Sequence, residues 1–323
     1  MNSEKRQLGK TGIEISPVAM GCWPITGITS LDVNRTDSLA TLSAAVDAGI
    51  NFFDTAFCYG LDGESEKLIA TALGPCRDDL VIATKGGIHW VSPSERVLDA
   101  HPERLKFEVD ESLRRLNTDR VDLLYLHAPD PQVPLTESAG ALHEIMDSGK
   151  TRAVGVSNFD VKQLEEFQSV CPISAFQPPY NMLQRDIEAQ TLPWCVAHEV
   201  AVFVYWPLMK GLLAGHLPRE HRFHPQDGRA KYPMFQGDEW QKNQDFLTEL
   251  RGVASTIGKS VAQVVVNWTI HRPGISAALC GAKRPAQIQE TADAMQWKLS
   301  HDQIAAIDQA IAKRGKPVTR GAV

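Results

Sequence analysis

Short apolar segments of strand length recur along the chain, and longer segments with the spacing of amphipathic helices lie between them. The short segments are apolar throughout rather than alternating, which is typical of strands in a parallel sheet covered on both faces. Strands that alternate with helices in this way favour an α/β fold, the (β/α)8 TIM barrel. The alternative is an open Rossmann-type sheet, but the G-x-G-x-x-G motif typical of that fold does not follow the first segment. The eight apolar segments are residues 18–20, 51–53, 80–83, 121–126, 152–156, 174–176, 201–204 and 275–279.

The intervening segments carry apolar residues at helical spacing, most clearly before Gly49 and after Pro102. A Gly that follows such a stretch is typical of a helix C-cap, where the chain adopts a left-handed conformation. We expect this role at Gly49, Gly74 and Gly149. The residues at helical spacing are Leu39, Leu42 and Val46 in the first stretch, and Leu105, Val109, Leu113 and Leu116 in the second.

Three segments fall outside this repeat of strands and helices. Residues 7–16 indicate a β-hairpin before the first strand, in a position to plug the bottom of the barrel. Between the last two strands lie a Pro- and Gly-rich loop at 207–237 and then two helical patterns, the second spanning 260–273. Ser300 and Gln303 have the spacing of a capping box and predict a final helix. Its apolar face is expected to carry Ile304, Ile307 and Ile311.

The amino-acid composition and net charge argue against several classes of protein. The chain has 323 residues, 43% of them hydrophobic, so we expect residues 1–323 to form a single domain with a substantial core. A net charge of −6 argues against nucleic acid as a partner. No apolar run approaches the ~18 residues that span a bilayer. Residues 1–7 lack the apolar core of a secretory signal, so we expect a cytoplasmic protein with no membrane partner. The six cysteines form no C-x-x-C pair and are interpreted as reduced thiols.

Polar residues follow several of the apolar segments, at the strand ends where a barrel of this kind carries its chemistry. Asp54, Lys85 and His127 end three consecutive segments, and Tyr59 follows Asp54 in the next loop. Each residue alone has an ordinary structural role, but their joint placement predicts a metal-free acid–base cluster. We expect Lys85, held by Asp54, to lower the pKa of Tyr59, and a neutral His127 to orient a carbonyl.

At these residues the sequence resembles the aldo-keto reductase superfamily, and the resemblance covers nearly the whole chain. It implies a (β/α)8 barrel with a catalytic tetrad of Asp54, Tyr59, Lys85 and His127, in which Tyr59 is the general acid/base. The implied reaction transfers a hydride between NADP(H) and an aldehyde, ketone or sugar carbonyl. The motifs that carry the resemblance are Leu8-Gly9-Lys10-Thr11-Gly12, Asp54-Thr55-Ala56-Phe57-Cys58-Tyr59-Gly60, Thr84-Lys85, Asp122-Leu123-Leu124-Tyr125-Leu126-His127, Gly155-Val156-Ser157-Asn158-Phe159 and Gln177-Pro178-Pro179-Tyr180-Asn181.

The resemblance also implies a cofactor position across the barrel mouth. Relatives often carry Ser where this chain has Trp206, so the side-chain contact to the pyrophosphate is replaced by the backbone amides of Leu208 and Gly211. Trp206 then forms a wall of the cofactor tunnel or faces the substrate. The residues implied to hold the nicotinamide are Ser157, Asn158 and Gln177 for its carboxamide and Tyr205 for its ring.

Physical argument and resemblance both assign the far end of the cofactor to residues 281–291. Backbone amides at a helix N-terminus favour an anion, and Lys283 and Arg284 can clamp a 2′-phosphate, which favours NADP(H) over NAD(H). The alternative is a solvated basic turn. Relatives commonly end this motif in Glu-Asn rather than Glu290-Thr291, which alters the adenine contact. The assigned residues are Gly281, Lys283, Arg284, Gln287, Glu290 and Thr291.

Aromatic residues in the loops after the first, third and seventh strands predict the pocket for a small carbonyl or alcohol substrate. They are Trp23, Trp90 and, in the 207–237 loop, Phe223, Tyr232 and Phe235. The same loop contains His216, His221 and His224, which we interpret as exposed polar residues rather than metal ligands.

Three other functions are compatible with parts of this pattern. A cofactor-binding regulatory subunit on the same scaffold would have no need of an intact tetrad. An NAD-dependent sugar dehydrogenase of the same family stays open as an alternative. A glycosidase needs two carboxylates across its site, and here Asp54 alone qualifies. Nothing in the sequence specifies an oligomeric state.

Overall fold

Eight parallel strands close into a barrel in the structure, a computed structural model that describes residues 4–29 and 31–318. Residues 1–3, part of the stretch considered above for a secretory signal, lie outside the described residues. The strands follow one another around the barrel in chain order, and β12 pairs with β3 to close it. All eight apolar segments contribute to these strands, which confirms the predicted (β/α)8 TIM barrel. The strands are β3 (Val18–Gly21), β4 (Phe52–Asp54), β5 (Val81–Gly86), β8 (Leu123–Leu126), β9 (Val154–Ser157), β10 (Ala175–Gln177), β11 (Ala201–Val204) and β12 (Ala277–Gly281).

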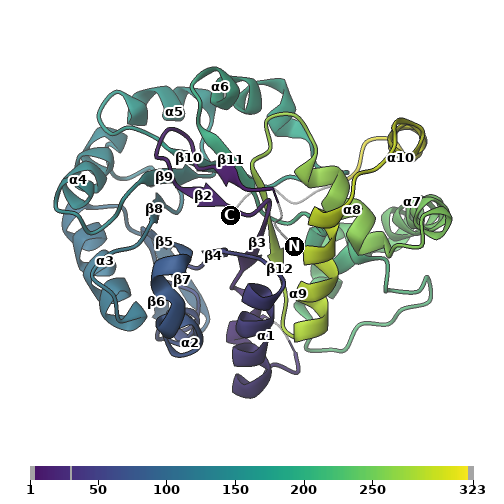
Figure 1. The fold of residues 1–323 in the computed structure, drawn as a ribbon, viewed down its shortest axis with the longest axis horizontal. Coiled ribbons are helices and arrows are strands. Elements are labelled where there is room, and N and C mark those ends of the chain that lie inside the picture. The colour runs from purple at the N-terminus through teal and green to yellow at the C-terminus, as the bar shows by residue number, and fades with distance from the viewer. Residues whose placement is uncertain (1–3, 30, 319–323) are drawn as a thin grey trace.

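Helices surround the barrel, and their apolar faces pack against the outward-facing side chains of the strands. Figure 1 shows this ring running from α1 in purple, through α4 in teal, to α9 in yellow-green. The extra helices expected near the C-terminus are present, and two of them, α7 and α10, pack against each other outside the ring (Figure 1). The helices are α1 (Arg35–Asp47), α2 (Glu64–Leu73), α3 (Pro102–Leu116), α4 (Leu135–Asp147), α5 (Val161–Gln168), α6 (Thr191–Ala197), α7 (Gly237–Thr256), α8 (Val261–Ile270), α9 (Pro285–Ala292) and α10 (His301–Arg314).

The N-terminal hairpin plugs one end of the barrel, as the sequence predicts. Its strands β1 (Arg6–Gln7) and β2 (Glu14–Ile15) pair antiparallel, and β2 lies over the centre of the ring in Figure 1. The side chains of Leu8, Ile13 and Ile15 are buried in one cluster with the apolar residues that fill the barrel interior. Because this hairpin leads directly into β3, it covers the N-terminal ends of the strands. The C-terminal ends are left to form the site.

The helix ends follow the predicted caps with one exception. Gly49 and Gly149 have positive φ angles of 85° and 81°. Gly74 is the C-cap residue of α2, as predicted, but it is not left-handed, because its φ is −48° and the chain continues into a 3-10 turn, Gly74–Asp79. Capping boxes open two of the predicted C-terminal helices, at Ser260 and Ser300.

A second antiparallel hairpin stands at the mouth of the barrel, after β5, where the sequence analysis expected only a loop. Its strands are β6 (Ile88–Ser92) and β7 (Glu95–Leu98), and Trp90 pairs across them with Arg96. The 207–237 loop is also more ordered than expected, since it contains the 3-10 turns η4 (Met209–Ala214), η5 (Gly228–Lys231) and η6 (Pro233–Phe235). Across residues 4–29 and 31–318, no helix combines the length and apolar character that a membrane span requires.

Candidate active site

The four residues of the predicted acid–base cluster meet at the C-terminal ends of adjacent strands. Asp54 ends β4, Lys85 lies in β5, His127 follows β8, and Tyr59 comes from the loop after β4. The Lys85 Nζ atom lies 2.5 Å from Asp54 Oδ1 and 3.3 Å from Tyr59 Oη. The rings of Tyr59 and His127 have centroids 6.0 Å apart. Parallel register produces this convergence, because Asp54 pairs with Ala83, two residues before Lys85.

Asp54 and Lys85 form a buried ion pair with further hydrogen bonds on both sides. Lys85 Nζ also donates to the carbonyl oxygen of Thr55, at 2.8 Å, and Gln177 Nε2 donates to Asp54 Oδ2 at 2.7 Å. Burial raises the pKa of Asp54, while Lys85 and the Gln177 hydrogen bond act in the opposite direction. Each buried charge is therefore stabilised by the other, and the Asp54 carboxylate is also stabilised by Gln177.

The expectation that Lys85 lowers the pKa of Tyr59 is wrong for this structure. Burial of the phenol, followed by the negative charge of Asp54, raises the pKa of Tyr59 well above its usual value of 10.0. The physical reason is that the Lys85 ammonium is compensated by Asp54, so the pair presents little net positive charge to the phenol. Tyr59 is consequently protonated over the physiological pH range and has a proton to donate.

His127 is held as a neutral imidazole. Burial, followed by the positive charges of Lys85 and Arg96, moves its pKa well below 6.5. Its Nδ1 atom lies 3.7 Å from the thiol sulfur of Cys58. Burial also raises the pKa of that thiol to about 11, so Cys58 is protonated and can donate to Nδ1. A proton on the other ring nitrogen, Nε2, is then available to a carbonyl oxygen.

The residues assigned to the nicotinamide form a hydrogen-bonded chain beside the cluster. Ser157 Oγ donates to the Gln177 carbonyl at 2.7 Å, and Asn158 Nδ2 contacts Ser157 Oγ at 3.1 Å. The Tyr205 hydroxyl donates to Asn158 Oδ1 at 2.8 Å. Asn158 also donates to the His127 carbonyl at 3.0 Å and has a φ of 65°. The structure therefore links the four residues to the acid–base cluster through His127 and Gln177.

The loop after β11 turns sharply next to this chain. Trp206 has a φ of 60° and its carbonyl accepts a hydrogen bond from Asn181 Nδ2 at 3.3 Å. Lys210 lies 4.4 Å above its ring, so the indole packs against a cation of its own loop. Arg229, which no sequence motif indicated, also approaches this turn. Its Nη1 atom lies 3.4 Å from the position that a Cβ on Gly211 would occupy. Leu208 is partly buried at the start of the turn.

The residues assigned to the far end of the cofactor surround the N-terminus of α9. The backbone amide of Lys283 donates to Gln287 Oε1 at 2.9 Å, and its ammonium donates to the Leu31 carbonyl at 2.8 Å. Arg284, the N-cap residue, is exposed, as is Gly281 at the end of β12. Glu290 Oε2 lies 3.7 Å from His216 Nε2. Thr291 is buried and its hydroxyl donates to backbone carbonyls of α9, so its side chain faces away from solvent.

The substrate residues predicted from the sequence separate into two groups. Trp23 packs edge-on against Tyr59, with centroids 5.0 Å apart, and the Trp90 indole donates to the Cys58 carbonyl at 2.9 Å. Both therefore lie beside the cluster. Phe223 and Phe235 instead pack against Trp240 of α7, in an apolar cluster internal to the long loop. Tyr232 lies under the ammonium of Lys210, at 4.8 Å.

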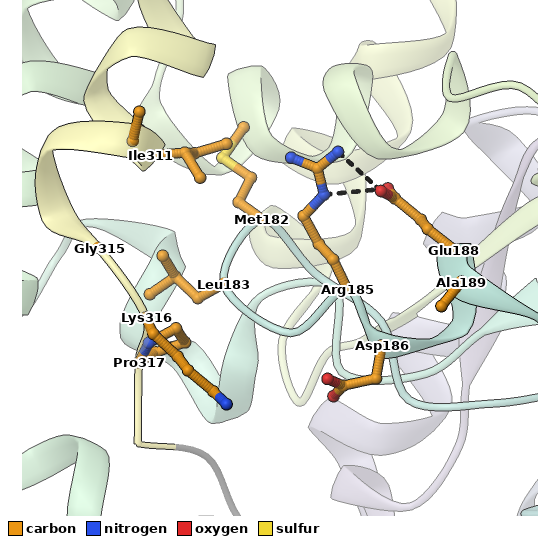
Figure 2. A pocket seen from close by; sticks show the side chains of 11 residues that line it. Met182, Leu183, Arg185, Asp186, Glu188, Ala189, Ile311, Gly315, Lys316 and Pro317 are labelled. Atoms are coloured by element: carbon orange, nitrogen blue, oxygen red, sulfur yellow. Dashed lines mark hydrogen bonds and ion pairs between the residues drawn. The ribbon is translucent and has the colours of Figure 1, made fainter.

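Other candidate sites lie outside the acid–base cluster. A groove of about 660 Å³ lies between the segment after β10 and the end of α10. Arg185 in this groove is already paired twice with Glu188 (Figure 2). Within the part of the chain that the structure describes, His216, His221 and His224 do not gather into a three-ligand group. The group that does so is Asp99, His101 and Asp130, whose potential ligand atoms lie within 4.8 Å of one another.

Comparison with known proteins shows the family of the chain. The model of the aldo/keto reductase family matches residues 17–312. The aldo-keto reductase YhdN of Bacillus subtilis is 36% identical over 302 residues, which cover 93% of this chain and 91% of the relative. The NADH-specific methylglyoxal reductase of Escherichia coli is 30% identical over 92% of this chain and 95% of its own. The solved structure of the glycerol dehydrogenase AKR11B4 from Gluconobacter oxydans superposes with a TM-score of 0.91 and 34% identity, covering 100% of this chain and 99% of that one. The resemblance in the sequence is thereby confirmed, and the chain belongs to the aldo/keto reductase family.

Proposed function

We propose that this protein is an NADP(H)-dependent oxidoreductase that interconverts a small aldehyde, ketone or sugar carbonyl and its alcohol. The observation that carries the proposal is the contact of Tyr59 Oη with Lys85 Nζ, at 3.3 Å, beside a neutral His127 at the barrel mouth. A protonated phenol next to a buried ion pair is a proton donor whose position is fixed. A covalent nucleophile is not needed for this chemistry.

The chain's own groups account for the proton and for the orientation of the substrate. Bound NADPH supplies the hydride that the carbonyl carbon receives. Tyr59 donates its hydroxyl proton to the carbonyl oxygen, and Lys85 Nζ, 3.3 Å from the phenol oxygen, donates a hydrogen bond to that oxygen as it loses its proton. His127 donates a hydrogen bond from Nε2 to the same carbonyl oxygen and orients it. In the oxidative direction Tyr59 accepts the proton from the alcohol.

The donor chemistry of the barrel mouth fits a nicotinamide cofactor. The amides of Asn158 and Gln177 and the hydroxyl of Ser157 match the donors and acceptors of a carboxamide, and the ring of Tyr205 lies next to them. At α9, the exposed Arg284 and the helix N-terminus fit a phosphate. Lys283 can reach the same phosphate only by giving up its hydrogen bond to the Leu31 carbonyl.

The test is a fluorescence titration of the protein with NADPH and with NADH, followed by turnover measurements on a panel of carbonyls, sugars and polyols. Tighter binding of NADPH with carbonyl-dependent oxidation of that cofactor supports the proposal. The second candidate is an NAD-dependent dehydrogenase, favoured by the names of two relatives, a glycerol dehydrogenase and an NADH-specific reductase. Preferential use of NAD(H) would establish that alternative instead.

Removal of both cations at α9 should reduce affinity for NADPH selectively. We expect the double variant Lys283→Ala/Arg284→Ala to bind NADPH about 10- to 100-fold more weakly, because charge-assisted hydrogen bonds to the 2′-phosphate are lost. Binding of NADH should change by less than about 3-fold, since it lacks that phosphate. Fluorescence titration measures both constants, and Lys313→Ala, which removes an exposed charge on α10, is the control. Equal losses for the two cofactors would rule out recognition of the 2′-phosphate at this turn.

The two directions of the reaction should depend differently on pH. The pKa of Tyr59 lies well above 10.0, so the phenol keeps its proton as pH rises to 10 and carbonyl reduction retains its donor. Alcohol oxidation needs the deprotonated phenol, and its rate should therefore rise about tenfold per pH unit below the pKa of Tyr59. Neither direction should lose activity between pH 8 and 6.5 through His127, which is neutral there. Initial rates in both directions measure this, and an oxidation rate that is level from pH 7 to pH 9 would contradict it.

A further inference from the structure

Arg96 lies at the rim of the barrel mouth, in contact with both tryptophans assigned to the substrate pocket. Its Cζ atom lies 5.3 Å from the ring centroid of Trp23 and 5.3 Å from that of Trp90. Trp90 is its cross-strand neighbour in the β6–β7 hairpin, whereas Trp23 belongs to the segment after β3. Contact with two aromatic rings holds a guanidinium in place. The Arg96 guanidinium also hydrogen-bonds the Cys58 side chain, and its other N–H donors are left for a ligand.

The two tryptophans position Arg96 directly beside the proton donor. The Trp23 ring packs on Tyr59 with centroids 5.0 Å apart. The Trp90 indole N–H donates to the carbonyl of Cys58, the residue before Tyr59, at 2.9 Å. The positive charge of Arg96 also contributes, after burial and Lys85, to the low pKa of His127. The guanidinium is therefore within electrostatic reach of the groups that would bind a carbonyl oxygen.

In the described part of the chain, Arg96 lacks an acidic partner, whereas three more buried cations near it, Lys85, Arg104 and Arg115, each have one. Lys85 is paired with Asp54 at 2.5 Å, Arg104 with Glu108 at 2.8 Å, and Arg115 with Glu66 at 3.3 Å. Among the residues that the structure describes, no carboxylate lies within ion-pairing distance of the Arg96 guanidinium. Its side chain is also exposed to solvent, so a ligand can reach it.

We propose that Arg96 binds an anionic group of the substrate, so that the preferred substrates are small carbonyl compounds carrying a carboxylate or a phosphate. This rests on the proposed function and names the substrate class of the same site. An arginine forms paired hydrogen bonds with either oxoanion, and the two indoles, each 5.3 Å from Cζ, restrict where the guanidinium lies. The anionic end of the substrate lies at Arg96, while the carbonyl oxygen lies between Tyr59 and His127.

The test compares matched substrates in the wild type, Arg96→Met, Arg96→Lys and Arg120→Met. One pair is 4-oxobutanoate and its methyl ester, and the other is glyceraldehyde 3-phosphate and glyceraldehyde. Arg120→Met is the matched control, because Arg120 is an exposed arginine in the turn that leads into β8, at the opposite end of the barrel. The two pairs separate carboxylate recognition from phosphate recognition.

We expect the wild type to favour at least one anionic member of these pairs. Arg96→Met should lower kcat/KM for it by about 10- to 100-fold, the effect of losing a hydrogen-bonded charge pair, and leave its neutral partner within about 3-fold. Arg96→Lys should retain an intermediate preference, because the charge is kept and the paired geometry is lost. Equal losses on charged and neutral substrates would overturn the proposal and make Arg96 a structural clamp of the hairpin.

A binding measurement keeps the test independent of turnover. Isothermal titration with succinate and with inorganic phosphate should show binding to the wild type that is at least about 10-fold weaker in Arg96→Met. If neither anion binds the wild type, the assignment of Arg96 is overturned. It is also overturned if both anions bind the wild type and Arg96→Met equally well. Turnover of the neutral ester and of glyceraldehyde tests the proposed reductase activity itself. The two proposals can therefore fail separately.

Discussion

Tyr59→Phe is expected to lower kcat for carbonyl reduction by about 10²- to 10⁴-fold, the contribution of a positioned general acid. The variant removes one oxygen atom and with it the proton that the carbonyl oxygen receives. The phenyl ring keeps its packing against Trp23 and His127, so the site should retain its shape. Lys85 keeps its hydrogen bonds to Asp54 and Thr55, and the buried charges stay satisfied.

Affinity for the cofactor separates a missing proton donor from a damaged site. Fluorescence titration of Tyr59→Phe with NADPH should give a dissociation constant within about 3-fold of the wild type, since no proposed cofactor contact is lost. Tyr180→Phe is the matched control, because its hydroxyl is bonded to Glu188 at 2.6 Å, away from the four residues of the cluster. Retention of most of the reductase activity in Tyr59→Phe would exclude it as the proton donor.

The convergence of the cluster was predictable because it follows from topology alone. In a closed parallel barrel the ends of consecutive strands are neighbours, so residues at the ends of three apolar segments had to meet. The assignments of Asp54, Lys85 and His127 to one mouth needed no side-chain detail. The contact of Tyr59 was predictable to the same extent, because it lies only five residues beyond Asp54.

The pKa values of the cluster residues were not predictable from the sequence, because they depend on burial and on contacts with further residues. Proximity to Lys85 suggested a lowered pKa for Tyr59, whereas burial and Asp54 raise it. The bond from Gln177 to Asp54 joins residues 123 positions apart, and the sequence offers no pattern for it. Cys58 was interpreted only as a reduced thiol, yet its sulfur lies 3.7 Å from His127. Such pairings are set by side-chain packing rather than by strand order.

The β6–β7 hairpin has a recognisable pattern in the sequence. Residues 88–98 read Ile-His-Trp-Val-Ser-Pro-Ser-Glu-Arg-Val-Leu, two β-favouring runs around a Ser-Pro-Ser turn. Recognising it would have paired Trp90 with Arg96 across the hairpin. The approach of Trp23 to the same guanidinium would still have required the structure, because that residue comes from the segment after β3.

Lys85→Met is expected both to abolish most activity and to destabilise the fold. It leaves the Asp54 carboxylate buried with Gln177 as its remaining side-chain partner, and breaking a buried ion pair in this way costs about 3 to 5 kcal/mol of unfolding free energy. The loss depends on pH. Burial already raises the pKa of Asp54, and removing Lys85, which lowers it, raises it further. A carboxyl whose folded pKa exceeds its unfolded value is neutral at low pH, and stability is lost as pH rises through the folded pKa. Denaturant unfolding should therefore show a smaller difference from the wild type at pH 5 than at pH 8.

The double variant Asp54→Asn/Lys85→Met distinguishes the charge from the packing. Replacing the carboxylate by an amide of the same shape removes the unpaired charge, so the double variant should recover most of the unfolding free energy that Lys85→Met loses at pH 8. It should recover no activity, because neither variant has the ammonium beside Tyr59. If the double variant is as unstable at pH 8 as Lys85→Met alone, the stem of Lys85 contributes by packing. The ion pair would then have no role in stability, and its place in the site would be explained by the support it gives to the phenol.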